Sequence, residues 1–136
     1  MNDAREVSSS LPALELEWLD DVLALVRLSA SAVFPHWIGS AGFVSVTRSE
    51  REMSIVAPIK CVPDGQSYVG PFRAARVRGE LPHHVVGVLV RLAEPLALAQ
   101  IPILAISTFD TDYVLVRAEH LKTATRAWRD AGFVVH

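Results

Sequence analysis

The chain has 136 residues, enough for one ordinary domain or two very small ones. Hydrophobic residues make up 51% of it, so we expect a folded core and surplus apolar surface that is covered in an interface. The balance of 13 basic and 15 acidic residues predicts no binding to nucleic acid. The single cysteine excludes an internal disulfide and is typical of a cytoplasmic protein. The apolar stretches are far shorter than the roughly 20 residues of a membrane span, so we expect no membrane binding.

The first half of the chain predicts strands with little helix. Residues 1–10 are polar and predict a disordered tail. Apolar residues alternate with glutamates from Leu14 to Trp18, which predicts a half-buried strand. A second strand is expected over Val22–Leu28, and a short helix limited by a proline over Ser29–Trp37. A hairpin is then expected from Gly42–Arg48 and Met53–Ala57.

Three prolines and two glycines between Pro58 and Pro71 mark a boundary, which predicts an N-terminal domain over residues 11–65 and a C-terminal domain over residues 70–136. The second domain has the expected order strand, helix, strand, strand, helix, strand over Phe72–Arg78, His84–Leu98, Ile103–Ile106, Tyr113–Val116, Ala118–Ala131 and Phe133–Val135. This is the ferredoxin-like βαββαβ order, in which both helices cover one face of an antiparallel sheet.

Single residues set the expected helix ends and faces of this domain. Pro95 should kink or shorten the last turn of its first helix. Gly132 should end the second as a C′ glycine. The residues expected to face the core are Val85, Val88, Leu89, Leu92 and Leu96 in the first helix and Leu121, Ala124 and Trp128 in the second.

The two halves share a spacing. Ser45 to Glu50 spans the same interval as Ser107 to Asp112, and each segment has an apolar strand on either side. We interpret this as a duplication whose first copy has eroded helices. The expected fold class is therefore α+β, with two ferredoxin-like units that have antiparallel sheets, the first of them degenerate.

The turn of the second hairpin is chemically crowded. Two carboxylates, Asp110 and Asp112, stand among hydroxyl and aromatic groups between two apolar strands. Neither strand alternates cleanly, so both of its faces are expected to be buried. Buried carboxylates are costly unless something binds there. The alternative is that both aspartates only cap the turn.

Four segments together resemble small bacterial proteins with a tandem pair of ACT domains, and the ACT pairs of the eukaryotic arginine sensor CASTOR. They are Phe43–Arg48, Glu52–Val56, Val86–Leu89 and Ile106–Val116. The resemblance extends from about Leu14 to the C-terminus. It implies amino-acid binding at an interface between ACT domains, without catalysis and without a cofactor.

The resemblance also implies a set of ligand-binding residues. The start of the first helix of the second domain, Val85-Val86-Gly87-Val88, would offer backbone N–H groups to an α-carboxylate, which suits a helix N-terminus. Asp112 would hold the α-ammonium, Thr108 and Phe109 would line the pocket, and the first domain would contribute Ser45 and Val46. The open alternatives are a packing role for Gly87 and ordinary strand roles for Ser45 and Val46.

His83 and His84 stand where a more acidic or hydroxyl-bearing helix start is expected. Adjacent residues diverge on a helix or strand, and no third ligand lies nearby, so we expect a surface or capping role and no metal site.

Three functions follow as hypotheses. The first is a non-catalytic sensor that binds a free amino acid or similar small zwitterion and forms a homodimer. The second is a structural oligomerisation module without a ligand. The third is a small ferredoxin-like enzyme that uses Asp110 and Asp112 as acid and base.

Overall fold

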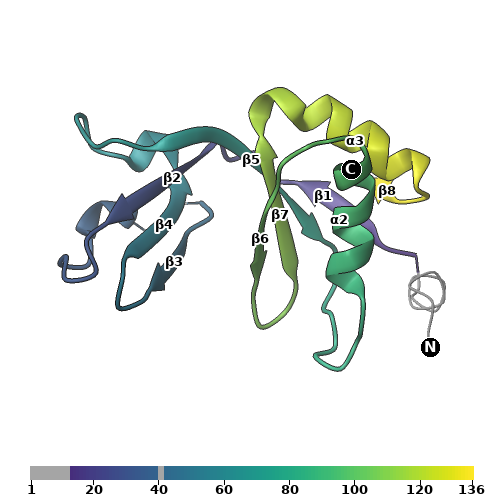
Figure 1. Ribbon diagram of the computed structural model, residues 1–136, viewed down its shortest axis with the longest axis horizontal. Coiled ribbons are helices and arrows are strands. Elements are labelled where there is room, and N and C mark those ends of the chain that lie inside the picture. Colours follow the sequence, from purple (N-terminus) through teal and green to yellow (C-terminus); the bar gives the residue numbers. More distant parts are fainter. Residues whose placement is uncertain (1–12, 40–41) are drawn as a thin grey trace. The chain divides into compact units, whose positions relative to one another are not determined.

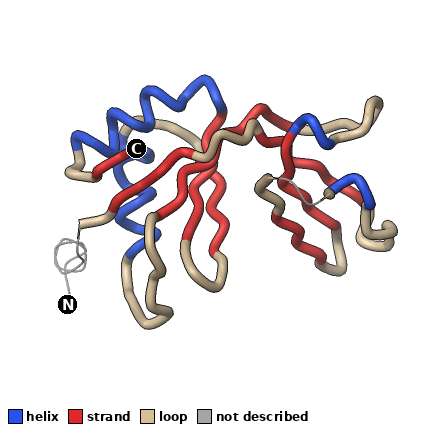
Figure 2. Tube along the Cα trace, turned by 180° about the vertical axis from the view of Figure 1, so that it is seen from behind, coloured by secondary structure: helices blue, strands red, loops and turns tan. Residues whose placement is uncertain are grey.

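The computed structural model describes residues 13–39 and 42–136 (Figures 1 and 2). The tail expected over residues 1–10 lies outside these ranges. The strands are β1 (Glu15–Trp18), β2 (Leu23–Leu28), β3 (Ser45–Arg48), β4 (Met53–Pro58), β5 (Val69–Val77), β6 (Leu104–Ser107), β7 (Asp112–Arg117) and β8 (Val134–Val135). The α-helices are α2 (Val88–Leu98) and α3 (Leu121–Asp130).

The chain forms two compact units that interleave along the sequence. Unit 1 contains the described residues up to Leu19 together with Ala74–His136, and unit 2 contains Asp20–Arg73. Strand β5 runs from one unit into the other. Strand β1 was expected in the N-terminal domain. It folds instead with the C-terminal half of the chain.

Unit 1 has the expected βαββαβ order from β5 to β8, with one insertion. Its strands are arranged β6-β7-β5-β1-β8. Strand β1 is antiparallel to β5 and parallel to β8, and so separates them. Glu17 lies opposite Arg76 in this register, and the Arg76 Nη2 is 2.7 Å from the Glu17 Oε1. The hydrogen bond from Arg76 lowers the pKa of Glu17 below its ordinary value of 4.5.

Both helices of unit 1 pack on one face of its sheet. Alternate strand residues point to the same face, and the core contains alternate residues of β5 and β7. The helices contribute Val88, Leu92, Leu96, Ala124 and Trp128 to this core, as expected from their spacing, and α2 and α3 lie together in Figure 1. The Trp128 indole N–H donates to the Leu92 carbonyl at 2.9 Å, which joins the two helices. Leu89 is 43% exposed, so its expected core position is wrong.

The two strands of the second hairpin differ in how their faces are buried. In β7 three successive residues, Val114, Leu115 and Val116, are buried, so both faces of this strand are covered as expected. In β6 the burial alternates, and Ala105 and Ser107 are exposed. The expectation of two covered faces therefore holds for β7 and is wrong for β6.

Helix α2 begins later than expected, at Val88 instead of His84. Gly87 has a φ of 88°, a left-handed conformation that a helix interior excludes, so the preceding residues form a separate turn. Pro95 lies inside the helix and does not end it. Helix α2 is instead followed by Gln100, whose φ is 58°.

Helix α3 ends as predicted. Gly132 has a φ of 96°, and the Phe133 N–H donates to the Trp128 carbonyl at 3.0 Å, the hydrogen bond of a Schellman motif with glycine at C′. The helix begins at Leu121, because the residues from Ala118 to His120 form a 3₁₀ turn.

Unit 2 is a sheet without an α-helix among its described residues. Its strands are arranged β3-β4-β2, and β2 pairs on its other side with the first part of β5. The helix expected over Ser29–Trp37 is wrong, since the described chain there forms only a 3₁₀ turn at His36–Ile38. The core of unit 2 consists of Ala24, Val26, Ile38, Met53, Ile55 and Ala57.

The two hairpins have the same pattern of strand pairs, with a different alignment from the one expected. Ser45 pairs with Val56 in the first hairpin as Leu104 pairs with Leu115 in the second. Arg48 likewise pairs with Met53 as Ser107 pairs with Asp112. The structural equivalent of Ser107 is therefore Arg48, three residues from the expected Ser45. The hairpins match pair for pair, and unit 2 has no α-helix among its described residues to cover its sheet as α2 and α3 cover that of unit 1.

Candidate functional site

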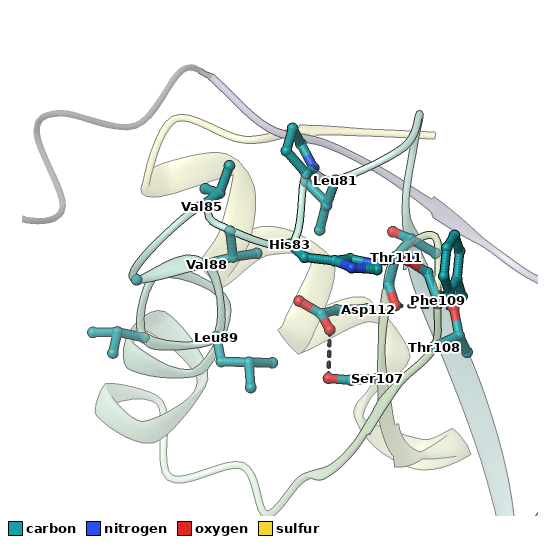
Figure 3. Close-up of a pocket in the computed structure, with 13 residues that line it drawn as sticks. Leu81, His83, Val85, Val88, Leu89, Ser107, Thr108, Phe109, Thr111 and Asp112 are labelled. Carbon is teal, nitrogen blue, oxygen red and sulfur yellow. Dashed lines mark hydrogen bonds between the residues drawn. The ribbon is translucent and has the colours of Figure 1, made fainter.

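A cavity of about 320 Å³ lies within unit 1, between the start of α2 and the turn that joins β6 to β7 (Figure 3). Two segments form its walls. The first contributes Leu81, Pro82, His83, Val85, Gly87, Val88, Leu89 and Val90, and the second contributes Ser107, Thr108, Phe109, Thr111 and Asp112. The first wall is almost wholly aliphatic, and the second is mostly polar. The cavity volume is at the small end of the roughly 300–1,000 Å³ of small-molecule sites.

The helix-side wall presents backbone donors. The first intrahelical hydrogen bond of α2 runs from the Arg91 N–H to the Gly87 carbonyl at 3.1 Å. The N–H groups of Val88, Leu89 and Val90 precede it and have no intrahelical partner. Within the described chain no side chain caps this helix start, and its first turn contains no acidic residue. The positive end of the helix dipole therefore faces the cavity without a side-chain cap.

The segment before α2 is held against the hairpin turn. The Leu81 N–H donates to the Asp110 carbonyl at 2.7 Å. The His83 Nε2–H donates to the Phe109 carbonyl at 2.6 Å, and the two rings meet edge to face with centroids 4.7 Å apart. This side chain is exposed and serves a surface role, as expected. We call these two hydrogen bonds the strap, because they fix the distance between the two walls.

The turn itself is rigidly hydrogen-bonded. The Thr108 N–H donates to the Thr111 carbonyl at 2.8 Å, and the Thr111 N–H donates to the Thr108 Oγ1 at 3.2 Å. Thr111 is 4% exposed, and its hydroxyl donates to the Val77 carbonyl at 2.8 Å. The turn is therefore tied to β5 as well as to the segment before α2.

Among the described residues, Asp112 is the one carboxylate that lines the cavity. It is half-buried at the start of β7, opposite Ser107 in β6, and the Ser107 hydroxyl donates to its Oδ1 at 2.5 Å. Figure 3 shows Asp112 between the helix start, with Val88 and Leu89, and the turn residues Thr108 and Phe109. The hydrogen bond from Ser107 fixes the carboxylate and leaves its second oxygen to accept from a cationic group.

The cavity brings together most of the residues named from the sequence. Its lining includes Val85, Gly87, Val88, Thr108, Phe109 and Asp112. Val86 is 69% exposed and is not part of the lining. Ser45 and Val46 lie in β3 of unit 2, opposite Val56 and Ile55, and also do not line it.

Sequence reasoning missed several lining residues. Ser107 and Thr111 were seen only as members of a polar turn, although their hydroxyls are the groups that orient Asp112 and the turn. Leu89 was expected to face the core, and Leu81 gave no signal of its own, because aliphatic residues beside a helix start are common in cores. Across the described ranges, no three His, Cys, Asp or Glu residues are grouped to hold a metal ion. Nor does any described helix have the length and apolar character needed to cross a membrane.

Residues 70–130 match the family model of the ACT domain, and residues 21–65 match a model of an N-terminal domain. The solved structure of Atu0741 from Agobacterium tumefaciens is 31% identical, with a TM-score of 0.85 over 93% of this chain and 94% of that chain. VC0802 from Vibrio cholerae, described as a protein of unknown function and possible transport protein, is 15% identical, with a TM-score of 0.72 over 88% and 90%.

The regulatory subunit of aspartate kinase from Thermus flavus is 13% identical, with a TM-score of 0.57 over 89% of this chain and 97% of that chain. At this identity, and at that of the Vibrio cholerae protein, the likeness shows a shared fold. No curated protein matches the chain.

Proposed function

Because the chain belongs to the same protein family as Atu0741 of Agobacterium tumefaciens and its residues 70–130 form an ACT domain, we propose that it is a non-catalytic regulatory protein that binds a free amino acid in the cavity of unit 1. One observation carries the proposal: a single small cavity is lined both by an uncapped helix start and by a fixed carboxylate. These two groups are complementary to the two charges of a zwitterion.

The helix start would bind the α-carboxylate. Unpaired first-turn N–H groups and the partial positive charge of the dipole, about half an elementary charge, both favour an anion there. Gly87 has no side chain to shield the first amides of α2, so a ligand can approach the backbone closely. Hydrogen bonds to an ionised carboxylate are stronger than those between neutral groups.

Asp112 would bind the α-ammonium. One of its oxygens already accepts the Ser107 hydroxyl, which sets the orientation of the carboxylate before a ligand arrives. An amino group that approaches the other oxygen forms a charge-assisted hydrogen bond. The strap and the turn hold both walls in place, so little ordering is required on binding and less affinity is lost to it.

We further propose that the chain is a tandem ACT protein similar to the CASTOR pairs, with unit 2 as the degenerate ACT-like unit, and that it acts as a homodimer. The pairwise match between the two hairpins supports the duplication. The side chain of Phe109 lines the cavity yet is 81% exposed, so it is available to contact a second copy of the chain.

Isothermal titration of the full chain with the common amino acids tests the proposal, with thermal unfolding in parallel. At least one amino acid should bind with a Kd below about 1 mM and raise the melting temperature, since a ligand that binds only the folded state stabilises it. Matched analogues that lack the amino or the carboxyl group should bind at least tenfold more weakly, because each charge-assisted contact contributes about 1.5–3 kcal/mol.

Absence of binding and of any thermal shift across the set would contradict the proposal and favour a ligand-free oligomerisation module. Equal binding of an amino acid and its deaminated analogue would show that the carboxylate of Asp112 does not receive an ammonium group.

A further inference from the structure

Resting on the proposed function, we infer that the ligand has a short, uncharged aliphatic side chain, as valine, leucine and isoleucine do. The basic and acidic amino acids are excluded from this choice. The inference depends on the side chains of the helix-side wall, since the α-carboxylate would bind only the backbone amides at the start of α2.

Apart from His83 and Gly87, the side chains of that wall are aliphatic. They are those of Leu81, Pro82, Val85, Val88, Leu89 and Val90. Leu81 and Val85 also pack against the core of unit 1, so their side chains are held in place from behind. A ligand side chain that lies on this wall exchanges water for hydrocarbon and gains affinity with each carbon that it buries.

The polar lining residues already have partners inside the protein. The Thr108 and Thr111 hydroxyls donate to backbone carbonyls, and the Ser107 hydroxyl donates to Asp112. The His83 Nε2–H is taken by the strap. A ligand side chain that accepts hydrogen bonds would therefore have to displace bonds that fix the turn, whereas an aliphatic one leaves all of them intact.

The charges of the lining oppose both kinds of charged side chain. Asp112 is its only carboxylate in the part of the chain that the structure describes, and pairing it with the α-ammonium leaves no acid for the side chain of lysine or arginine. The described lining residues include no lysine or arginine, so an aspartate or glutamate side chain would lie near Asp112 without a cation to offset the repulsion. A lysine side chain could place its methylene groups on the wall only with its ammonium group in water.

A series of amino acids with increasingly large side chains, which we call the ligand ladder, tests the inference by isothermal titration of the full-length protein. Affinity should rise from alanine through valine to leucine by about fourfold per added carbon, or roughly sixtyfold from alanine to leucine. Norleucine has the same stem as lysine without its ammonium group, and it should bind at least tenfold more tightly than lysine. Glutamate and arginine should bind more weakly than leucine.

A matched pair of variants locates the ligand. Val85→Thr keeps the size of the side chain and places a hydroxyl in the aliphatic wall. It should therefore raise the Kd for leucine severalfold and reduce the gain in affinity from alanine to leucine along the ladder. Val134→Thr makes the same change at a valine that is 48% exposed in β8 and outside the lining, and it should leave the ladder unchanged. Melting temperatures of both variants show that each is folded.

The outcomes separate the two proposals. If arginine, lysine or glutamate binds as tightly as leucine, the side-chain inference is overturned while amino-acid binding stands. If no amino acid binds, both fail. If the ladder appears but is identical in Val85→Thr, the ligand lies elsewhere on the molecule and the inference is overturned.

Discussion

Replacement of Asp112 by asparagine isolates the charge that we assign to the ligand's ammonium group. Asparagine keeps a carbonyl oxygen to accept the Ser107 hydroxyl, so the hairpin retains its hydrogen bond and stability should change by less than about 1 kcal/mol. The ligand's ammonium group then meets a neutral amide in place of the carboxylate. Hydrogen bonds to charged groups contribute about 1.5–3 kcal/mol, so the Kd of the bound amino acid should rise by roughly tenfold to hundredfold.

The chain provides a matched control two residues away. Asp110 lies in the same turn, but its side chain does not line the cavity, and only its backbone carbonyl is used by the strap. Asp110→Asn makes the same change in net charge and should leave the Kd within about twofold, since exposed charges contribute little and are screened by salt. Isothermal titration of both variants at the same ionic strength compares them directly.

Two results would refute the reasoning. If both variants weaken binding equally, the effect is one of overall charge, and no specific contact is involved. If Asp112→Asn binds as tightly as the unaltered protein while the deaminated ligand does not bind, the ammonium group is recognised by another part of the molecule.

Three further changes test what stabilises unit 1. Thr111→Val removes the buried hydroxyl that donates to the Val77 carbonyl, and should lower the free energy of unfolding in urea by about 1–3 kcal/mol. Gln100→Gly relieves a φ of 58° after α2 and should raise that free energy by about 0.5–1 kcal/mol, since the left-handed conformation costs other residues more than the extra chain entropy of glycine. The lowered pKa of Glu17 means that its pairing with Arg76 stabilises the fold fully above pH 4.5 and is lost as the pH falls through the folded-state pKa. Urea unfolding at pH 6 and pH 3 should therefore show a smaller acid loss in Glu17→Gln than in the unaltered chain.

The hairpin of β6 and β7 could be predicted because its signals are local. Two apolar runs and a polar turn lie within a few residues of one another, which predicts the hairpin. The observed pairing extends one residue beyond each apolar run, to Ser107 and Asp112. The end of α3 is equally local, since a glycine at C′ needs no distant partner. Both features depend on backbone geometry that neighbouring residues determine.

The errors arise where distant segments or a single backbone angle decide the structure. The alternation of apolar and acidic residues predicts that Glu15–Trp18 is a strand. It does not indicate which strands it pairs with, because the partners β5 and β8 lie far along the chain. The start of α2 was predicted four residues early, because the apolar spacing continues through the turn before it. The left-handed φ of Gly87 ends that continuity.

The site could be predicted in part because the order of elements brings its two walls to one end of unit 1. Helix α2 runs away from its start at Val88, and the chain then returns through β6, so the end of β6 lies beside the start of the helix. The turn after Ser107 and the opening of β7 at Asp112 must then lie at that same end. A helix N-terminus and a strand end that share one edge of a sheet form a common place for small ligands in folds that mix helices and strands. Which residues line the space between them was not accessible in the same way, because the strap between His83 and Phe109 joins segments separated by the whole of α2.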